Sequence, residues 1–129
     1  MASIIDTIKN LEKLKHLQPA SPADVSAAEK QLGLNFAPDY KAYTQAYGAI
    51  QAKDLEFTGV GVPPRLNVVA VTLEEREMQS IPASCYVLED LGIEGLLVLQ
   101  DSAGTIYEFM DGKTNKIAGS MAEYVMSKK

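Results

Sequence analysis

Hydrophobic residues recur at steps of three and four through the first 48 residues, which is the spacing of one face of an α-helix. Over residues 3–17 this pattern, carried by isoleucines and leucines, predicts an amphipathic helix. A second helix is predicted to begin at Pro22, after the N-cap residue Ser21, and to end at Gly33, which suits a left-handed C-cap. The chain is therefore expected to open with helices that are separated by proline and glycine.

Four aromatic side chains define the helix that follows, which is predicted to begin at Pro38 and to end at Gly48. They are Phe36, Tyr40, Tyr43 and Tyr47. Their spacing of four, three and four residues places them on one helical face. Such a stripe is usually core, so we expect the rings to be packed and the hydroxyls to be hydrogen-bonded or at the rim. The alternative is that the tyrosines line a small-molecule pocket between this helix and a sheet.

After Gly48 the pattern changes to β-branched and aromatic residues broken by glycine and proline, which is typical of strands joined by turns. The clearest hairpin joins GLLVLQD to TIYEFMD, with Gly104 in the turn. Thr72 followed by Glu75 is a capping-box pattern and predicts the start of a short helix. We expect strands near residues 55–58, 85–90, 95–101 and 105–111, a strand or extended segment near 66–71, and a shorter extended piece within 112–119.

The chain is predicted to close with a helix, because Ser120 and Glu123 repeat the capping-box spacing ahead of Tyr124. Helices first, strands next and a helix last make an α+β fold, in which a mainly antiparallel sheet is packed by the N-terminal helices. No repeat or linker interrupts the sequence. We therefore expect residues 1–129 to form a single domain.

Composition places the chain among ordinary globular proteins, with 129 residues of which 47% are hydrophobic and 22% are charged. Its apolar runs are only a few residues long, so none is expected to span a bilayer. The N-terminus has an early aspartate and interleaved charges in place of the apolar core of a secretory signal. The one cysteine, Cys85, excludes an internal disulfide, and the cytoplasm is the simplest compartment.

Negative charge is concentrated in one segment of the sequence. The formal net charge is −5, yet residues 1–73 hold seven acidic and seven basic side chains. Residues 74–111 hold nine acidic side chains and one basic side chain, Arg76. Such a segment is expected to repel nucleic acid and to attract a basic partner, although acidic runs are commonly solvated faces that aid solubility.

Few residues offer catalytic or metal-binding chemistry. His16 and Cys85 are the only histidine and cysteine, so they cannot complete a zinc site, and nothing in their spacing pairs them as base and nucleophile. GVGVPP and DGKTNK lack the spacing of a phosphate loop and of a calcium loop. A pair such as Glu89 with Glu108 is a weak sign of glycoside chemistry in any acidic protein. An enzyme is not excluded, but no constellation supports one, and we expect no cofactor and no metal.

The stretch SPADVSAAEKQLGLNFAPDYKAYTQAYG resembles the N-terminal signature of the SUKH superfamily, which includes fungal cell-wall-synthesis regulators and many bacterial immunity proteins. That signature is a capped helix with an acidic residue before a Leu-Gly end, then an apolar-Pro-x-Tyr helix that closes in a glycine turn. The matching residues are Ser21, Glu29, Leu32, Gly33, Phe36, Pro38, Tyr40, Tyr43 and Gly48. The sequence departs from the pattern where Ala37 separates Phe36 from Pro38 and where YGAI replaces the common NGG. Downstream, TIYEFMDG and SMAEYVMS are similar to the family's strand with an acidic turn and to its closing helix.

The resemblance implies an α+β fold without catalysis and a small antidote that binds and neutralises a cognate toxin, often a nuclease. Together with the charge asymmetry, it predicts that an acidic surface covers the substrate-binding face of a basic toxin. The expected contact residues are Glu74, Glu75, Glu77, Glu89, Asp90 and Glu94. We expect a monomer or weak homodimer that binds no nucleic acid and no membrane. A regulatory adaptor linked to cell-wall processes stays open as an alternative.

Overall fold

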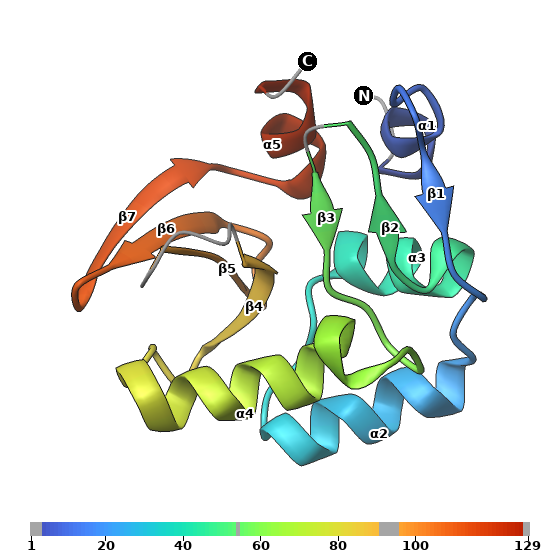
Figure 1. Cartoon of the computed structure of the whole chain (residues 1–129). Coiled ribbons are helices and arrows are strands. Elements are labelled where there is room, and N and C mark those ends of the chain that lie inside the picture. Colours follow the sequence, from blue (N-terminus) through green and yellow to red (C-terminus); the bar gives the residue numbers. More distant parts are fainter. Residues whose placement is uncertain (1–3, 54, 91–95, 128–129) are drawn as a thin grey trace.

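The computed structural model describes residues 4–53, 55–90 and 96–127 (Figure 1). The helices in these ranges are α1 (Ile4–Lys9), α2 (Pro22–Leu32), α3 (Pro38–Tyr47), α4 (Val68–Gln79), α5 (Met121–Ser127) and the short 3-10 helix η1 (Pro64–Leu66). The strands are β1 (Lys15–His16), β2 (Ile50–Gln51), β3 (Glu56–Phe57), β4 (Cys85–Asp90), β5 (Leu97–Asp101), β6 (Ile106–Met110) and β7 (Lys113–Ala118).

The strands form two antiparallel sheets, ordered β1-β2-β3 and β4-β5-β6-β7 (Figure 1). The sheets meet where β3 lies against β4, and there the Thr58 amide donates a hydrogen bond of 2.9 Å to the Leu88 carbonyl. The Thr58 hydroxyl donates a second one, of 2.7 Å, to the Val87 carbonyl. The predicted α+β class with a closing helix is thus confirmed, while the strands are divided between two sheets where the sequence indicated one.

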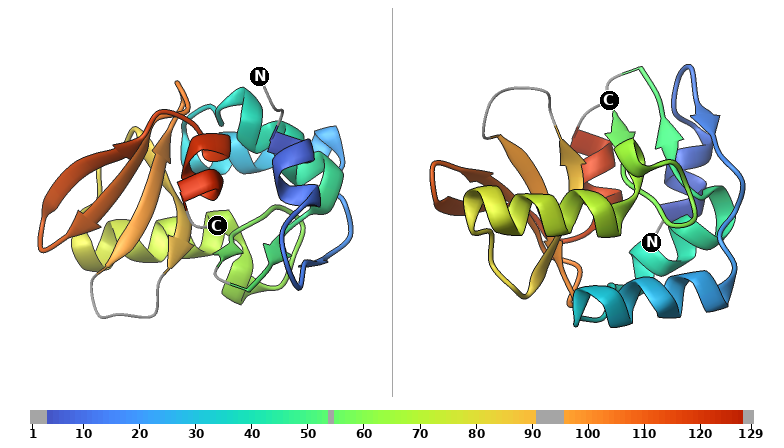
Figure 2. Two further views of the ribbon diagram at one scale, coloured as in Figure 1. Left: turned by 90° about the horizontal axis from the view of Figure 1, so that it is seen from above. Right: turned by 60° about the horizontal axis from the view of Figure 1, so that its bottom comes forward.

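The helices are distributed around the two sheets (Figures 1 and 2). α4 packs along β4, and α2 lies beside both α4 and α3. α1 contacts α3 and α5, and α5 also contacts β7, so the first and last helices lie side by side. One large core cluster joins all five helices to both sheets, and a smaller cluster fills the space between α4 and the sheet β4-β5-β6-β7.

The first helix is shorter than predicted. α1 ends at Lys9, whereas the apolar pattern favoured a helix over residues 3–17. Lys13 has a positive φ of 56°, and the chain then pairs as β1 with β2. Leu11 and Leu14 are nevertheless packed against the core. The helical spacing therefore identified side chains that contact the core, but pairing with a strand distant in sequence decided the backbone conformation.

The predicted helices α2 and α3 are confirmed together with their caps. The Ser21 hydroxyl accepts a hydrogen bond of 3.1 Å from the Asp24 amide, and Gly33 has a left-handed φ of 69°. Gly48 follows α3 with a φ of 74°, and a Cβ atom on it would lie 2.1 Å from the carbonyl oxygen of Gln18. Glycine is required at this turn because the segment before α2 passes against it.

The aromatic stripe is part of the core, as predicted. Phe36, Tyr40 and Tyr43 are at most 2% exposed, and Tyr86 of β4 is buried among them. The ring centre of Tyr86 lies 4.8 Å from that of Phe36 and 4.9 Å from that of Tyr40. Tyr47 is partly buried at the rim. These rings fill the space in which a small-molecule pocket was the alternative.

α4 begins earlier than the sequence predicted. The segment 66–71, expected as a strand or an extended segment, contains its first residues. The N-cap is Asn67, whose Oδ1 accepts a hydrogen bond of 2.9 Å from the Val69 amide. Thr72, expected at the helix start, lies inside the helix, and its hydroxyl accepts a hydrogen bond of 3.0 Å from the Val87 amide. β-branched residues favour strands by propensity, but here packing against α2 and β4 stabilises the helix.

The hairpin and the closing helix are confirmed. β5 and β6 pair on either side of a turn in which Gly104 has a φ of 98°. The Ser120 hydroxyl accepts a hydrogen bond of 3.1 Å from the Glu123 amide, and the Glu123 carboxylate accepts one of 2.9 Å from the Gly119 amide. The sequence pattern did not predict β1 and β2, which have two residues each and show no alternation. β3 has the same length but falls within the strand predicted near residues 55–58.

Candidate protein-binding surface

α4 has one side turned to the interior and one turned to solvent. Val68 and Thr72 on the inner side are fully buried. The opposite side exposes residues at steps of three and four, which is the spacing of one helix face. We call this set the α4 outer face, and it consists of Ala70, Leu73, Glu74, Glu77 and Met78.

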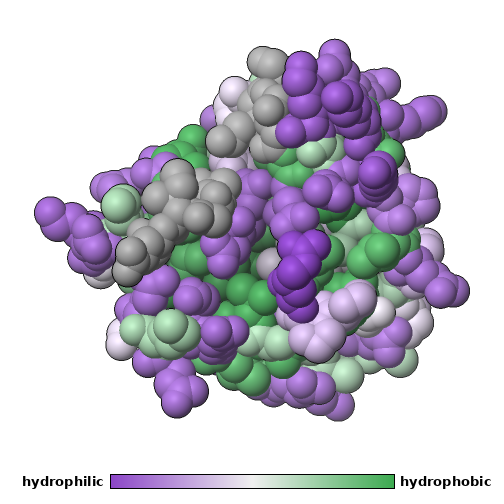
Figure 3. All heavy atoms as spheres, in the orientation of Figure 1, coloured by the Kyte–Doolittle hydropathy of each residue, from purple (hydrophilic) through white to green (hydrophobic). Residues whose placement is uncertain are grey.

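The α4 outer face combines apolar and acidic side chains. Leu73 is 44% exposed and Met78 is 70% exposed, although both are large hydrophobic residues. Glu74 and Glu77 lie beside them, three residues apart on the same face. In Figure 3 the lower part of the molecule, where α4 and α2 lie in Figure 1, likewise shows hydrophobic and hydrophilic atoms side by side. Around the helix the two glutamates lie between Leu73 and Met78. Large apolar side chains exposed beside charged ones suit a protein contact site.

The other charged residues of α4 are engaged within the molecule. Arg76, the one basic residue of the acidic segment, binds the loop after α4, where its Nη2 donates a hydrogen bond of 3.2 Å to the Ala83 carbonyl. Glu75 is partly buried, and its carboxylate accepts hydrogen bonds of 3.2 and 3.3 Å from the Gln79 amide group. Of the contact residues predicted on α4, Glu74 and Glu77 are therefore the accessible ones.

Glu89, also predicted as a contact residue, lies inside the fold and is only 3% exposed. Its Oε1 accepts a hydrogen bond of 2.6 Å from the Tyr124 hydroxyl, and its Oε2 accepts one of 2.8 Å from the Glu56 amide. Burial raises the pKa of the Tyr124 hydroxyl, and the hydrogen bond to Glu89 raises it further. Glu89 thus connects β4 with α5 and β3, and we leave it out of any accessible surface.

Asp90 and Glu94 complete the predicted contact residues. Asp90 is exposed at the end of β4, where it borders a small cavity of about 230 Å³ together with Glu56 and Arg65. The Arg65 Nη1 and the Glu56 Oε1 form an ion pair at 3.0 Å on the wall of this cavity. Glu94 lies outside the described residues. The structure thus brings Glu74 and Glu77 onto one face and places Asp90 beside a separate cavity.

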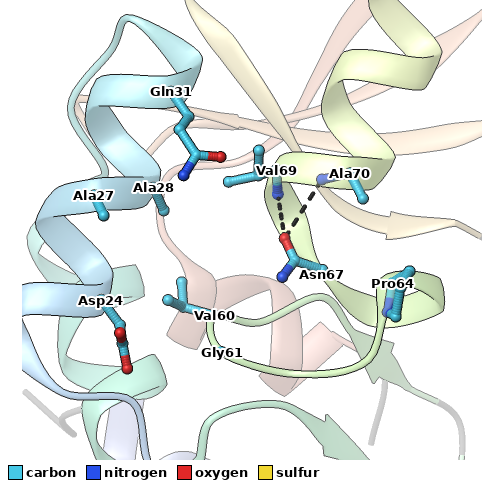
Figure 4. A pocket seen from close by; sticks show the side chains of 10 residues that line it. All are labelled: Asp24, Ala27, Ala28, Gln31, Val60, Gly61, Pro64, Asn67, Val69 and Ala70. Carbon is cyan, nitrogen blue, oxygen red and sulfur yellow. Dashed lines mark hydrogen bonds between the residues drawn. The ribbon is translucent and has the colours of Figure 1, made fainter.

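A groove with a volume of about 370 Å³ separates α2 from the start of α4 (Figure 4). It is lined by Asp24, Ala27, Ala28, Gln31, Val60, Gly61, Pro64, Asn67, Val69 and Ala70. The Asn67 side chain is occupied by capping α4, and its Nδ2 donates a hydrogen bond of 3.3 Å to the Val62 carbonyl. Ala70 belongs both to this groove and to the α4 outer face, so the two features are continuous.

The two residues with nucleophile or base chemistry lie on different sheets. His16 is exposed on β1, with its ring centre 5.4 Å from that of Tyr47. Cys85 is buried at the start of β4, and burial raises the pKa of its thiol, which is the opposite of the activation that a nucleophile needs. Among the described residues, no three histidine, cysteine, aspartate or glutamate side chains are grouped so that they could hold a metal ion. The helices in the same part of the chain lack the length and hydrophobicity of a membrane-spanning segment.

Sequence reasoning missed Leu73 and Met78, the apolar half of the α4 outer face. The signal was present in the spacing, since Leu73 lies four residues before Glu77 and Met78 lies four residues after Glu74. The sequence did not show that this face is the exposed one. A polar Thr72 and an apolar Leu73 suggest the reverse orientation, yet Thr72 is buried and Leu73 is exposed.

A comparison with protein families matches nearly the whole chain. The family model described as SUKH_5: SMI1-KNR4 cell-wall covers residues 1–128. The match therefore spans every helix and strand from α1 to α5. A search among curated proteins finds no match.

Proposed function

The chain belongs to SUKH_5, the SMI1-KNR4 cell-wall family, and from this membership we propose that it is a non-catalytic domain that binds and neutralises a cognate toxin. Residues 1–129 act as one binding domain in this proposal. The expected toxin is a basic protein. A nuclease fits well, because a protein that binds nucleic acid needs a positively charged surface for the phosphates.

One observation supports this proposal above the others, namely that α4 exposes Glu74 and Glu77 next to Leu73 and Met78. Exposed charges steer a partner of opposite sign and accelerate association. Apolar side chains then hold the docked partner, because their burial removes apolar area from water. The same surface suits nucleic acid poorly, since carboxylates repel phosphates.

The proposed mechanism is occlusion of the toxin's substrate-binding face. A nuclease must keep its basic surface open to the phosphates of its substrate. An acidic helix docked on that surface occupies the same positive charges and excludes the substrate. This mechanism requires tight binding and no catalytic group on the side of the antidote.

The test is co-purification from native lysate with the full chain as bait, at low and at high salt. A single basic partner that is released by salt, is encoded next to this chain and loses its activity when bound would support the neutralising role. A retained partner whose activity is unchanged at saturating concentrations of the chain would overturn it.

A regulatory adaptor is the second candidate, and the family description favours it because it refers to the cell wall. An adaptor is expected to retain several unrelated cellular proteins without inhibiting one of them. The same lysate experiment separates the two roles, since a toxin antidote retains one partner and inhibits it.

A further inference from the structure

The α4 outer face and the groove between α2 and α4 form one continuous surface through Ala70. Figure 4 shows the groove from close by, with Asp24 and Gln31 toward its opposite ends on α2. The side chains of Val60 and of Val69, which belongs to α4, point into the space between the two helices and make the groove wall apolar. Together the two features extend from α2 across the start of α4 and along its length.

Small side chains keep the groove open to a guest. Ala27 and Ala28 line it from α2, and Ala70 lines it from α4. A side chain that is no larger than a methyl group lets a partner approach the helix backbone closely. Beyond the groove, Leu73 and Met78 lie on the two sides of the α4 outer face, with Glu74 and Glu77 between them, at 44% and 70% exposure.

The charges on this surface select a basic guest. Glu74 and Glu77 lie along the α4 outer face, and Asp24 lies at one end of the groove. Among the described residues that line the groove or form the outer face, none is basic. A second copy of the chain docked by the same face would bring these carboxylates together, so like-charge repulsion disfavours self-association here.

We propose that the groove and the α4 outer face form one docking site for a basic amphipathic helix of a protein partner. The identity of that partner as a toxin rests on the proposed function, whereas the site itself rests on the groove and on the exposed side chains. The exposed part of α4 consists of helix side chains, both apolar and acidic, and not of the backbone edge that an extended peptide would pair with.

The dimensions of α4 suit this guest. α4 has 12 residues and is therefore about 18 Å long, which accommodates about three turns of a second helix. The apolar side of the guest contacts Leu73 and Met78 and places side chains in the groove. Its lysines or arginines face Glu74 and Glu77, which lie between Leu73 and Met78 around α4.

The probe for the test is a synthetic peptide of about four helical turns with leucines on one face and lysines on the other. It is titrated into the ¹⁵N-labelled full chain, and we expect amide shift changes in α2, in α4 and at Val60 and Gly61. Met78→Ser is expected to weaken binding about fivefold or more, because an apolar anchor carries a large share of the affinity. A peptide with glutamates in place of the lysines should not bind.

The matched control is Met126→Ser, which removes a methionine that is 57% exposed on α5. Its dissociation constant should equal that of the unaltered chain, and thermal unfolding checks that both variants are folded. Shift changes confined to Asp90 and its cavity would overturn the proposal. Equal losses with Met78→Ser and Met126→Ser would also overturn it, and so would binding that Met78→Ser leaves unchanged.

The outcome for the site is separable from the outcome for the proposed function. A toxin from the lysate that the Met78→Ser chain still binds and inhibits would contradict the proposed docking site and support the neutralising role. Peptide-induced shift changes in α2 and α4 would support the docking site. If the chain also retained several cellular partners without inhibiting them, the neutralising role would be contradicted.

Discussion

Tyr43 shows how a polar group is accommodated within the aromatic core. Its ring is fully buried, and its hydroxyl donates a hydrogen bond of 2.8 Å to the Thr58 carbonyl while it accepts one of 3.1 Å from the Ile50 amide. The hydroxyls of Tyr40 and Thr58 share a further hydrogen bond of 2.9 Å. Because each buried hydroxyl has a partner, the tyrosines bury their rings without an unsatisfied polar atom.

Replacing Tyr43 tests its place in the core. Tyr43→Ala should lower the free energy of unfolding by about 3–5 kcal/mol, since it empties a large buried site. Tyr43→Phe should cost about 1–2 kcal/mol, because it leaves the Ile50 amide and the Thr58 carbonyl without this partner. Denaturant unfolding measures both, with the partly buried Tyr47→Ala as a control that loses less. Near-normal stability of Tyr43→Ala would reopen the small-molecule pocket as an alternative.

The buried tyrosines also predict how stability depends on pH. Burial raises the pKa of Tyr40, Tyr43 and Tyr86 above the ordinary value of about 10. The folded state therefore holds these phenol protons more tightly than the unfolded state does. This stabilisation is complete below the unfolded pKa and declines as the pH rises above about 10.

We expect these three tyrosines to ionise together as the chain unfolds in alkali. The share of the phenolate absorbance that belongs to these three tyrosines should appear together with the loss of the folded circular dichroism signal, recorded on the same samples. Ionisation of all six tyrosines near pH 10, while the circular dichroism stays that of the folded chain, would contradict the prediction.

At the scale of elements, α4 contributes both to the core and to the proposed contact surface. Its inner side supplies Val68 and Thr72 to the interior, and the Thr72 hydroxyl bonds the backbone of β4. Its outer side carries Leu73, Glu74, Glu77 and Met78. The orientation of the outer face therefore depends on how firmly the helix is held at its start.

Asn67 should stabilise the start of α4, because it is the N-cap residue of this helix. Asn67→Ala is expected to lower the free energy of unfolding by about 1–2 kcal/mol, because it removes the acceptor for the Val69 and Ala70 amides. Asn67→Asp keeps a capping oxygen and should lose less, although it gives up the bond to the Val62 carbonyl. Chemical denaturation measures the free energy of unfolding of both variants. Equal losses would show that helix capping by Asn67 is not the cause of the destabilisation.

At the scale of the whole molecule, charge is the property that links the fold with the proposed function. Glu77→Lys changes the net charge by +2 at the α4 outer face, and Glu12→Lys makes the same change elsewhere. Glu12 is a suitable control because its ion pair with Lys53, at 3.5 Å, is exposed and therefore contributes little.

We expect Glu77→Lys to slow association with a retained basic partner about tenfold at low salt, and Glu12→Lys to have a much smaller effect. The difference should shrink at high salt, because exposed charges are then screened. Stopped-flow association rates at two salt concentrations measure it. Equal rates for the two variants would show that the charge of α4 does not guide the partner.

Several features of this protein were determined by the sequence alone. The caps at Ser21, Gly33 and Ser120, the Gly104 hairpin and the burial of the tyrosine stripe were all predicted correctly. Each depends on residues within a few positions of one another, where backbone geometry and periodicity determine the outcome. The resemblance to the SUKH superfamily relied on the same local features, and the family match confirms it.

Other features were decided only by tertiary structure. β1 replaced the end of a predicted helix because β2 pairs with it, and α4 replaced a predicted strand because α2 and β4 pack against it. Glu89 is buried because the Tyr124 hydroxyl and the Glu56 amide meet its carboxylate. Leu73 is exposed while Thr72 is buried because the Val87 amide bonds the Thr72 hydroxyl. In each case the deciding partner is distant in the sequence, so no local pattern could indicate which conformation or which face it would stabilise.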